Sequence, residues 1–363
     1  MSTIIQHPSA CLLPEQVTLI RSFARTAEEA GQLTEEQVSL AVQQRWFTML
    51  APAVYNGDEK PLPEVVRLEE AIAWADGSMG WVVTLCSGAG WFGGFMNTAL
   101  ANIIFTAAEA CLAGSGAATG IAEKTEDGYR VSGKWWYASG TPHNTVFTAN
   151  CKLVSNGVPL TGDNGEPLVK AFAFFRSEVE IIPTWQSFGL VATASHAFEV
   201  KELSVPENRL FTIDASEAIT KRPLYQYPFL QLAEVTLAAN LSGMALHFME
   251  EAILLIVPKS DAEPGVEHET FKNECLAIEK CRQSFYAALD TSWQQQMEGN
   301  VTEALLQQVS ETARGLAAQS RIAVERVYPF CGMAAADKQT EINRVWRDLH
   351  TASQHNLLAY PRK

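Results

Sequence analysis

The sequence predicts a mainly helical α+β protein in which a strand-rich middle segment separates two helical segments. Apolar residues recur at helical spacing in the first and last thirds of the chain, whereas the middle holds short runs rich in Val, Phe, Tyr and Trp. The chain has 363 residues, 47% hydrophobic and 19% charged, which is typical of a globular protein with two or three domains. We expect an N-terminal helical domain (1–109), a middle antiparallel β-domain (110–212) and a C-terminal four-helix bundle (213–363).

The N-terminal helices are predicted from apolar spacing and from end signals. Pro14–Leu33 has helical spacing, and Thr34–Leu50 follows with its first residue as N-cap and Gln37 three residues later, a capping-box pattern. A helix from Pro63 should end near Asp76, where Asp-Gly-Ser interrupts it before a second apolar helix. We interpret the Gly- and aromatic-rich stretch GAGWFGGFMN that follows as close helix packing, with contact to a ligand ring as the alternative.

The middle segment has strand character. Its runs are bounded by turn residues, and SNGVPLTGDNGEP carries an Asn-Gly pair typical of a hairpin, so we expect an antiparallel sheet or small barrel. The stretch GSGAATG (Gly114–Gly120) does not fit a dinucleotide motif, because Thr119 falls on the third glycine position. We interpret it as a strand-to-loop segment with exposed backbone N–H groups, or as a plain tight turn. The predicted strand runs are Asp127–Gly140, Thr145–Ser155, Lys170–Ile182 and His196–Phe211.

The last third returns to helical spacing. Three long helices are expected, the first of them apolar on most faces, followed by a turn at YPFCGM and a final helix. Four helices of this length suggest an antiparallel bundle. The predicted helices are Tyr227–Ile256, Glu269–Gln296, Glu303–Phe330 and Asn343–Asn356.

Charge and cysteine usage exclude several classes of function. The net charge is −14 and the pI about 5.0, which opposes binding to nucleic acid or to anionic membrane surfaces. We expect no signal peptide and no transmembrane helix. The seven cysteines form no CxxC motif and no HExxH motif is present, so we expect reduced thiols in a cytoplasmic protein and no metal site.

Two short segments contain candidate functional residues. In WWYASGTPHN (Trp135–Asn144) small polar groups, Ser139 and His143, lie beside aromatic residues, which suits an aromatic ligand, although aromatic strand residues are more often core. The final helix contains two of the seven histidines, His350 and His355. Helical spacing would place His355 at the edge of an apolar face; a terminal helix with solvated or satisfied histidines is the alternative.

Four segments together resemble a known family. They resemble the acyl-CoA dehydrogenase superfamily, and most closely its two-component flavin-dependent monooxygenases, whose oxygenase components act on 4-hydroxyphenylacetate or dibenzothiophene. The resemblance covers nearly the whole chain. It implies that family's fold, a homo-oligomer (dimer or tetramer), and a flavin ring between the β-domain and the bundle. The segments are Ala75–Trp81, Gly128–Gly140, Thr184–Pro206 and Asn343–His355.

The resemblance also implies which residues surround the flavin. The loop matching LAGSGAATG would touch the pyrimidine edge, and the segment matching WYASG would cover the ring near N5. The implied flavin contacts are Ala113 through its backbone, Thr119, Trp136, Ala138, Ser139, Trp185 and Ser195. Candidates for the substrate pocket are Trp81 and His143.

The two main activities of the family need different catalytic groups. A dehydrogenase needs a carboxylate base, which in many members follows an Arg-Asp pair, but this chain has His355 or Asn356 at that place. Glu250 and Glu251, on an earlier helix, remain alternative bases. A monooxygenase instead needs a group that ionises or polarises an aromatic substrate, and imidazole exchanges protons near neutral pH.

The family's Arg-x-x-Phe-Gly element, which grips the flavin pyrophosphate, is also missing. RQSF (Arg282–Phe285) matches it only in part. This departure makes tight retention of FAD doubtful, so the resemblance implies reduced FAD or FMN supplied from outside. A separate flavin reductase would account for the absence of a nicotinamide-binding motif.

The resulting hypothesis is the oxygenase component of a two-component monooxygenase acting with O₂ on a small aromatic or heterocyclic substrate. His355 would be the acid or base, and Ser139 would donate a hydrogen bond near flavin N5. His350 and His196 are weaker candidates. The alternatives are an FAD-dependent acyl-CoA dehydrogenase with a displaced base, and a degenerate member that binds flavin without turnover.

Overall fold

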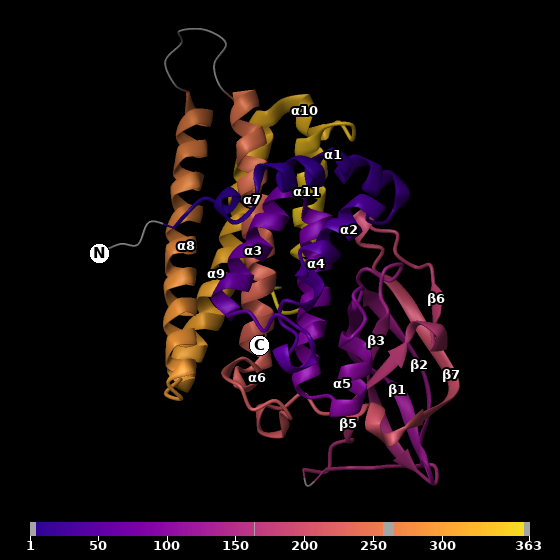
Figure 1. The fold of residues 1–363 in the computed structure, drawn as a ribbon. Helices are drawn as coiled ribbons and strands as arrows, with labels where there is room; N and C mark the ends of the chain where they lie inside the picture. Colours follow the sequence, from indigo (N-terminus) through magenta and orange to yellow (C-terminus); the bar gives the residue numbers. More distant parts are fainter. Residues whose placement is uncertain (1–4, 163, 257–264, 359–363) are drawn as a thin grey trace.

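The protein consists of N-terminal helices, a central β-sheet and a group of long C-terminal helices (Figure 1). The computed structural model describes residues 5–162, 164–256 and 265–358; Asp163, inside the predicted hairpin segment, lies outside them. The predicted fold class is confirmed. The N-terminal helices are α1 (Pro14–Ala30), α2 (Glu35–Gln43), α3 (Leu62–Ala75), α4 (Gly77–Gly90) and α5 (Thr98–Phe105).

Local end signals explain the N-terminal helices. The Thr34 hydroxyl accepts a bond from the backbone N–H of Gln37, and the Gln37 side chain accepts one from the N–H of Thr34, so the capping box is confirmed. The predicted continuation of α2 to Leu50 is wrong, because Arg45 takes a left-handed conformation (φ 57°) that ends the helix. Asp76 ends α3 as expected and caps α4 by accepting the N–H of Met79 at 2.8 Å.

The described residues form an eight-stranded sheet with the order β6-β7-β2-β1-β3-β5-β8, with β4 paired to β3. The expectation of an antiparallel sheet is wrong for one pair: β1 and β3 run parallel. The segment 114–120 lies within β1, where the register with β3 shifts between Ser115 and Gly120. The strands are β1 (Leu112–Thr125), β2 (Gly128–Ala138), β3 (Val146–Ser155), β4 (Val158–Pro159), β5 (Val169–Phe175), β6 (Glu180–Ile182), β7 (His196–Pro206) and β8 (Leu210–Phe211).

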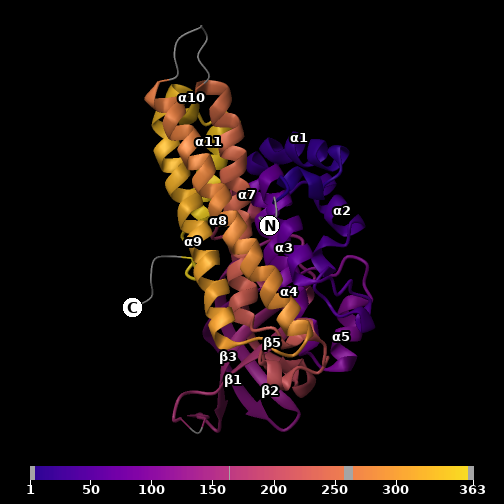
Figure 2. The same ribbon diagram turned by 90° about the vertical axis from the view of Figure 1, so that its left-hand side faces the viewer.

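The C-terminal helices stand beside the N-terminal ones, with the sheet at one end (Figure 2). The helix α7 is apolar and long enough to cross a membrane by composition alone, which the sequence analysis missed. However, 78% of its most apolar window is buried within the protein, where it packs against α3, α9 and α11. The helices are α6 (Pro223–Gln226), α7 (Phe229–Ile256), α8 (Val266–Met297), α9 (Glu303–Val327), α10 (Gly332–Ala336) and α11 (Glu341–Ala352).

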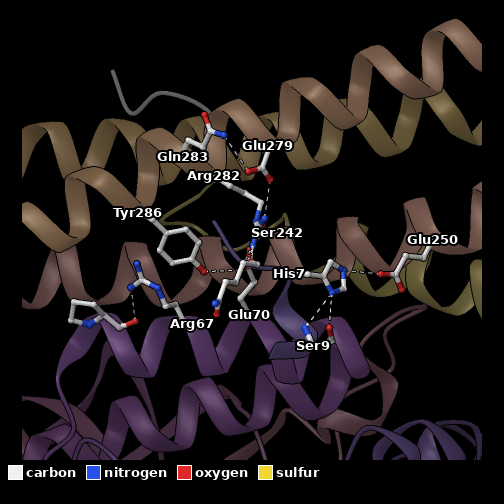
Figure 3. A network of polar contacts seen from close by, with 12 residues as sticks. His7, Ser9, Arg67, Glu70, Ser242, Glu250, Glu279, Arg282, Gln283 and Tyr286 are labelled. Carbon is white, nitrogen blue, oxygen red and sulfur yellow. Dashed lines mark hydrogen bonds and ion pairs between the residues drawn. The ribbon is translucent and has the colours of Figure 1, made fainter. Parts of the chain in front are cut away.

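A buried network of charged groups joins α3, α7 and α8 (Figure 3). The Glu70 carboxylate accepts two bonds from the Arg282 guanidinium, each 2.9 Å long, one from the Tyr286 hydroxyl at 2.7 Å and one from the Ser242 hydroxyl at 2.5 Å. Arg282 is only 2% exposed, so its guanidinium bonds to other groups of this network and not to solvent. The arginine of the RQSF segment therefore joins α8 to α3, and it is not available to bind a ligand.

Candidate functional site

A cavity of about 550 Å³ lies where α4, β1, β3 and α7 meet the segment that follows α11. Its walls are mostly small or apolar, and its polar side chains are hydroxyls, amides and one imidazole. Among the described residues that line it, none is Asp or Glu. Residues that define it are Thr84, Gly88 and Phe92 near α4, Ala113, Ser139 and Asn150 in the sheet region, Leu232 and Thr236 on α7, and His355 and Asn356 after α11.

The Ser139 hydroxyl lies at the end of a buried chain of hydroxyls. Ser139 Oγ is 2.9 Å from Ser195 Oγ, and Ser195 Oγ is 2.7 Å from Thr193 Oγ1. Thr193 Oγ1 in turn donates to the carbonyl oxygen of Leu190 at 2.8 Å. The carbonyl only accepts and each hydroxyl has one proton. All three bonds form together only when Ser139 donates to Ser195 and Ser195 donates to Thr193.

The polarity of this chain decides what Ser139 offers to a ligand. Because its proton points to Ser195, Ser139 presents oxygen lone pairs to the cavity. The sequence analysis expected it to donate, and the hydroxyl chain favours the opposite role. Its backbone is held as well, since the Asn144 side chain donates to its carbonyl at 3.0 Å. Tyr137, two residues earlier, has φ +65°, where the register of β2 with β7 is irregular.

The sequence predicted that His355 lies within the final helix. In the structure His355 lies after the end of that helix. α11 ends at Ala352, and the backbone N–H of His355 donates to the Ala352 carbonyl at 3.0 Å, which tightens the last turn. The ring of His355 meets the ring of Trp81 edge to face, with centroids 5.9 Å apart. Its Nδ1 accepts the N–H of Leu357 at 3.3 Å, which favours the neutral tautomer with the proton on Nε2.

Helix α11 also holds the loop that carries the hydroxyl chain. The Asp348 carboxylate accepts the backbone N–H of Leu190 at 2.5 Å, and the Arg347 guanidinium donates to the Phe188 carbonyl at 2.7 Å. Between them, a Cβ at Gly189 would lie 2.0 Å from the Arg347 carbonyl oxygen, so only glycine permits this approach. Burial and the nearby Asp76 raise the pKa of Asp348 to about 7.

The other residues suggested by the sequence lie at varied distances from the cavity. Ala113 lines it, while Trp81 and Ser195 support lining residues. Trp185 donates to the Leu190 carbonyl behind the hydroxyl chain. Four others do not line it either. Thr119 bonds to the Lys134 carbonyl, and Trp136 is half-exposed beneath the Lys134 ammonium. Ala138 is buried in the sheet core, and His143 lines another cavity.

His143 lines a different cavity, beside the start of α2. Burial lowers the pKa of its imidazole to about 4, so the ring is neutral. His196 serves a structural purpose, because its Nδ1 accepts the backbone N–H groups of Thr184 and Trp185 at 3.2 and 3.0 Å. His350 pairs with Glu325 and with the Trp346 carbonyl.

Sequence reasoning missed the helical wall of the cavity. Gly88 and Phe92, within the GAGWFGGFMN stretch that was assigned to packing, face this space. A Cβ at Gly88 would meet no other atom within 4 Å, whereas one at Gly94 would lie 2.3 Å from the Tyr225 ring. The packing interpretation therefore holds at Gly94, whereas Gly88 borders open cavity space. The glycine spacing was a signal, but it did not distinguish open space from close contact.

The alternative carboxylate bases lie elsewhere. Glu250 pairs with His7 Nε2 at 2.9 Å and with Arg21 at 3.6 Å. Glu251 lies near His247 and Glu341. Neither lines the cavity, so the described structure provides no support for a displaced dehydrogenase base.

One buried acid, Glu69 on α3, lies behind the cavity wall. Its Oε1 is 2.9 Å from the Ser87 hydroxyl, and Oε2 has no hydrogen-bond partner among the described residues. Burial raises the pKa of Glu69 from 4.5 to about 8. The folded state therefore keeps a proton that the unfolded state releases, so Glu69 makes stability fall as pH rises between about 4.5 and 8.

We expect Glu69→Gln to remove this dependence. The stability of the wild type relative to the variant should decrease by up to about 1.4 kcal/mol per pH unit within that window. Urea unfolding of both proteins at pH 5, 6, 7 and 8 measures the difference. Glu64→Gln, at a half-exposed position of the same helix, is the matched control and should leave the slope unchanged. If the difference in unfolding free energy between wild type and Glu69→Gln did not change with pH, the result would contradict this role of Glu69.

Comparison with known proteins agrees with this geometry. Residues 257–360 match the family model described as acyl-CoA dehydrogenase, C-terminal domain. The chain is 26% identical over 375 residues to HsaA, the oxygenase subunit of a flavin-dependent monooxygenase from Mycobacterium tuberculosis, covering 95% of this chain and 89% of HsaA. It is 23% identical over 323 residues to the indole-3-acetate monooxygenase of Acinetobacter baumannii, covering 86% and 80% of the two chains.

Solved structures show the same fold. The crystal structure of the M. tuberculosis HsaA monooxygenase aligns with a TM-score of 0.87 at 21% identity, over 97% of this chain and 92% of that one. XiaF from Streptomyces sp., solved with FADH2 and glycerol, aligns with a TM-score of 0.83 at 19% identity, over 95% and 89%. Over nearly its whole length the chain is therefore similar to the oxygenase components of two-component flavin-dependent monooxygenases, a branch of the acyl-CoA dehydrogenase superfamily.

Proposed function

We propose that this oxygenase component hydroxylates a small aromatic or heterocyclic substrate in the cavity between α4, β1 and α7. The observation that carries the proposal is the lining itself. It combines an imidazole and several hydroxyls with apolar walls, and it has no carboxylate among the described residues. An apolar space with a few polar groups suits an aromatic ring bearing a hydroxyl or ring nitrogen. Indole-3-acetate monooxygenase, a relative, is named for such a substrate.

The cavity residues fit a reduced flavin. The register of β1 with β3 shifts between Ser115 and Gly120, where the Gly116 carbonyl accepts from the Asn150 side chain at 2.9 Å, and this irregular stretch suits the polar edge of a flat ring. Reduced flavin has an N–H at N5, whereas oxidised flavin has a lone pair there. A hydrogen-bond acceptor at Ser139 therefore favours the reduced form. When bound, the reduced flavin supplies two electrons to O₂, so that one oxygen atom enters the substrate and the other leaves as water.

In this proposal His355 orients the substrate and exchanges a proton with it. An Nε2–H imidazole donates to a phenolic or ring oxygen and draws negative charge onto it. The edge contact with Trp81 and the bond from Leu357 restrict the ring, so that its position does not depend on the substrate. Leu232, Phe92 and the neighbouring apolar walls exclude water from the same space.

We further propose that the reduced flavin arrives from a separate reductase. The name of HsaA as an oxygenase subunit supports this. The arginine of the partial RQSF match, Arg282, is buried against Glu70, which suits a flavin that exchanges. We also propose a homo-oligomer, dimer or tetramer, because Tyr137 and Phe188 expose 71% and 54% of their surface beside the site loop.

The proposal is tested by adding reduced FAD or reduced FMN to the protein without oxygen and then mixing with O₂. We expect a transient absorbance that differs from both reduced and oxidised flavin, with one flavin preferred. With an NADH-driven flavin reductase, a panel of phenols and indoles should yield an oxygenated product detectable by mass spectrometry. Bleaching of bound oxidised FAD by an acyl-CoA without reductase would instead indicate a dehydrogenase, and absence of flavin binding would contradict both.

A further inference from the structure

A cluster of three potential metal ligands lies away from the cavity, between α7 and the start of α11. His247 and Glu251 are one helical turn apart on the same face of α7, and Glu341 is the first residue of α11. One ligand atom from each lies within 4.8 Å of the others. Motifs at short spacing did not predict this cluster, because Glu341 is far from the other two residues in the chain.

The His247 imidazole is buried, and its Nδ1 has no partner among the described residues. The residue is 1% exposed, and Nδ1 makes no hydrogen bond to the described residues. Its Nε2 lies 3.2 Å from Glu341 Oε1 and forms an ion pair with it when the ring is protonated. A buried polar atom without a partner costs free energy, and a metal ion on the imidazole would remove that cost.

The charges around the cluster leave a deficit of positive charge. Four carboxylates, from Asp76, Glu250, Glu251 and Glu341, face two guanidinium groups. Arg344 lies 3.3 Å from Glu341 and 4.0 Å from Asp76, and Arg21 lies 3.6 Å from Glu250. His7 also approaches this region, but it contacts Glu250 (Figure 3).

We propose that His247, Glu251 and Glu341 bind a divalent transition-metal ion of the zinc type. Imidazole nitrogen with two carboxylate oxygens suits such ions better than Ca²⁺ or Mg²⁺, which prefer oxygen ligands alone. Glu341 is 35% exposed, so solvent reaches the site and water completes the coordination. None of the three residues lines the cavity. The ion is structural, joining α7 to α11, the helix that holds the Leu190 loop and leads to His355.

Zinc binding to chelator-treated full-length protein tests the proposal. We expect one Zn²⁺ per chain by calorimetry and elemental analysis, together with a higher Tm. His247→Gln and Glu341→Gln should each weaken binding at least about tenfold and abolish the rise in Tm. Glu279→Gln, a partly exposed glutamate of α8 outside the cluster, is the control and should bind as the wild type does.

Cobalt separates this site from the seven free thiols, of which Cys11 is exposed. Co²⁺ bound to nitrogen and oxygen has only weak visible bands, whereas thiolate ligation adds an intense near-ultraviolet band. We expect the weak bands, lost in His247→Gln and kept in His7→Gln. A thiolate band, loss of binding in His7→Gln but not in His247→Gln, or no retained metal would each overturn the proposal, whatever the outcome for flavin.

Discussion

Replacing His355 by alanine is expected to lower the yield of hydroxylated product per flavin oxidised at least about tenfold while reduced flavin still binds. A positioned acid or base contributes on the order of 10²–10⁴ to a rate, and His355 provides the imidazole that lines the cavity. The backbone and small residues of β1 and the Ser139 hydroxyl, which we assign to the flavin, are unchanged in this variant. The measurement is product by chromatography in the reductase-coupled reaction, with anaerobic titration of reduced flavin beside it.

His350→Gln is the matched control for that variant. His350 lies five residues earlier, near the end of α11, but it bonds to Trp346 and Glu325 and does not line the cavity. We expect its product yield to stay close to that of the wild type. An unchanged yield in His355→Ala would remove His355 from the mechanism, and an equal loss in both variants would indicate a general effect on α11.

Replacing Glu70 by alanine is expected to cost the fold about 3–5 kcal/mol. Arg282 is 2% exposed and Glu70 accepts both of its bidentate bonds, so the variant leaves a buried positive charge with only the partly exposed Glu279 as a charged partner. The hydroxyls of Tyr286 and Ser242 lose their acceptor at the same time. Urea or thermal unfolding measures the loss, and Glu70→Gln, which keeps an acceptor but not the charge, should fall between alanine and wild type.

Glu279→Ala provides the comparison, because it removes a second carboxylate from the same arginine. Glu279 lies 3.0 Å from Arg282, but its side chain is 37% exposed, so its loss should cost about 1 kcal/mol or less. If Glu70→Ala were no more destabilising than Glu279→Ala, the buried network would not be a major source of stability.

The local signals in the sequence predicted several boundaries correctly. The caps at Thr34 and Asp76 each join atoms three residues apart, so the local sequence contains all of the interaction. The long helices α7, α8 and α9 were predicted within a few residues, because their spacing persists over many turns. The end of α2 at Gln43 was missed because no Gly marks the left-handed residue Arg45, and the parallel pairing of β1 with β3 was missed because it depends on residues distant in the chain.

The candidate site was only partly predictable. Ala113, Ser139 and His355 were named from a resemblance, and the structure brings all three to one cavity. The direction of the Ser139 hydroxyl was not predictable, because it depends on Ser195 and Thr193, which a different strand region supplies. His143 lies close to Ser139 in the sequence and was named with it, yet it lines another cavity.

By itself the sequence determined the helical and strand segments, their order, the acidic surface, and the presence of an imidazole where a dehydrogenase would have a carboxylate. These properties reside in the periodicity and identity of neighbouring residues. Only the tertiary structure decided that Arg282 binds Glu70, that Glu69 keeps its proton, and that Asp348 holds the Leu190 loop. Each of these depends on burial and on partners from other elements, because desolvation and hydrogen-bond geometry exist only once the chain has folded.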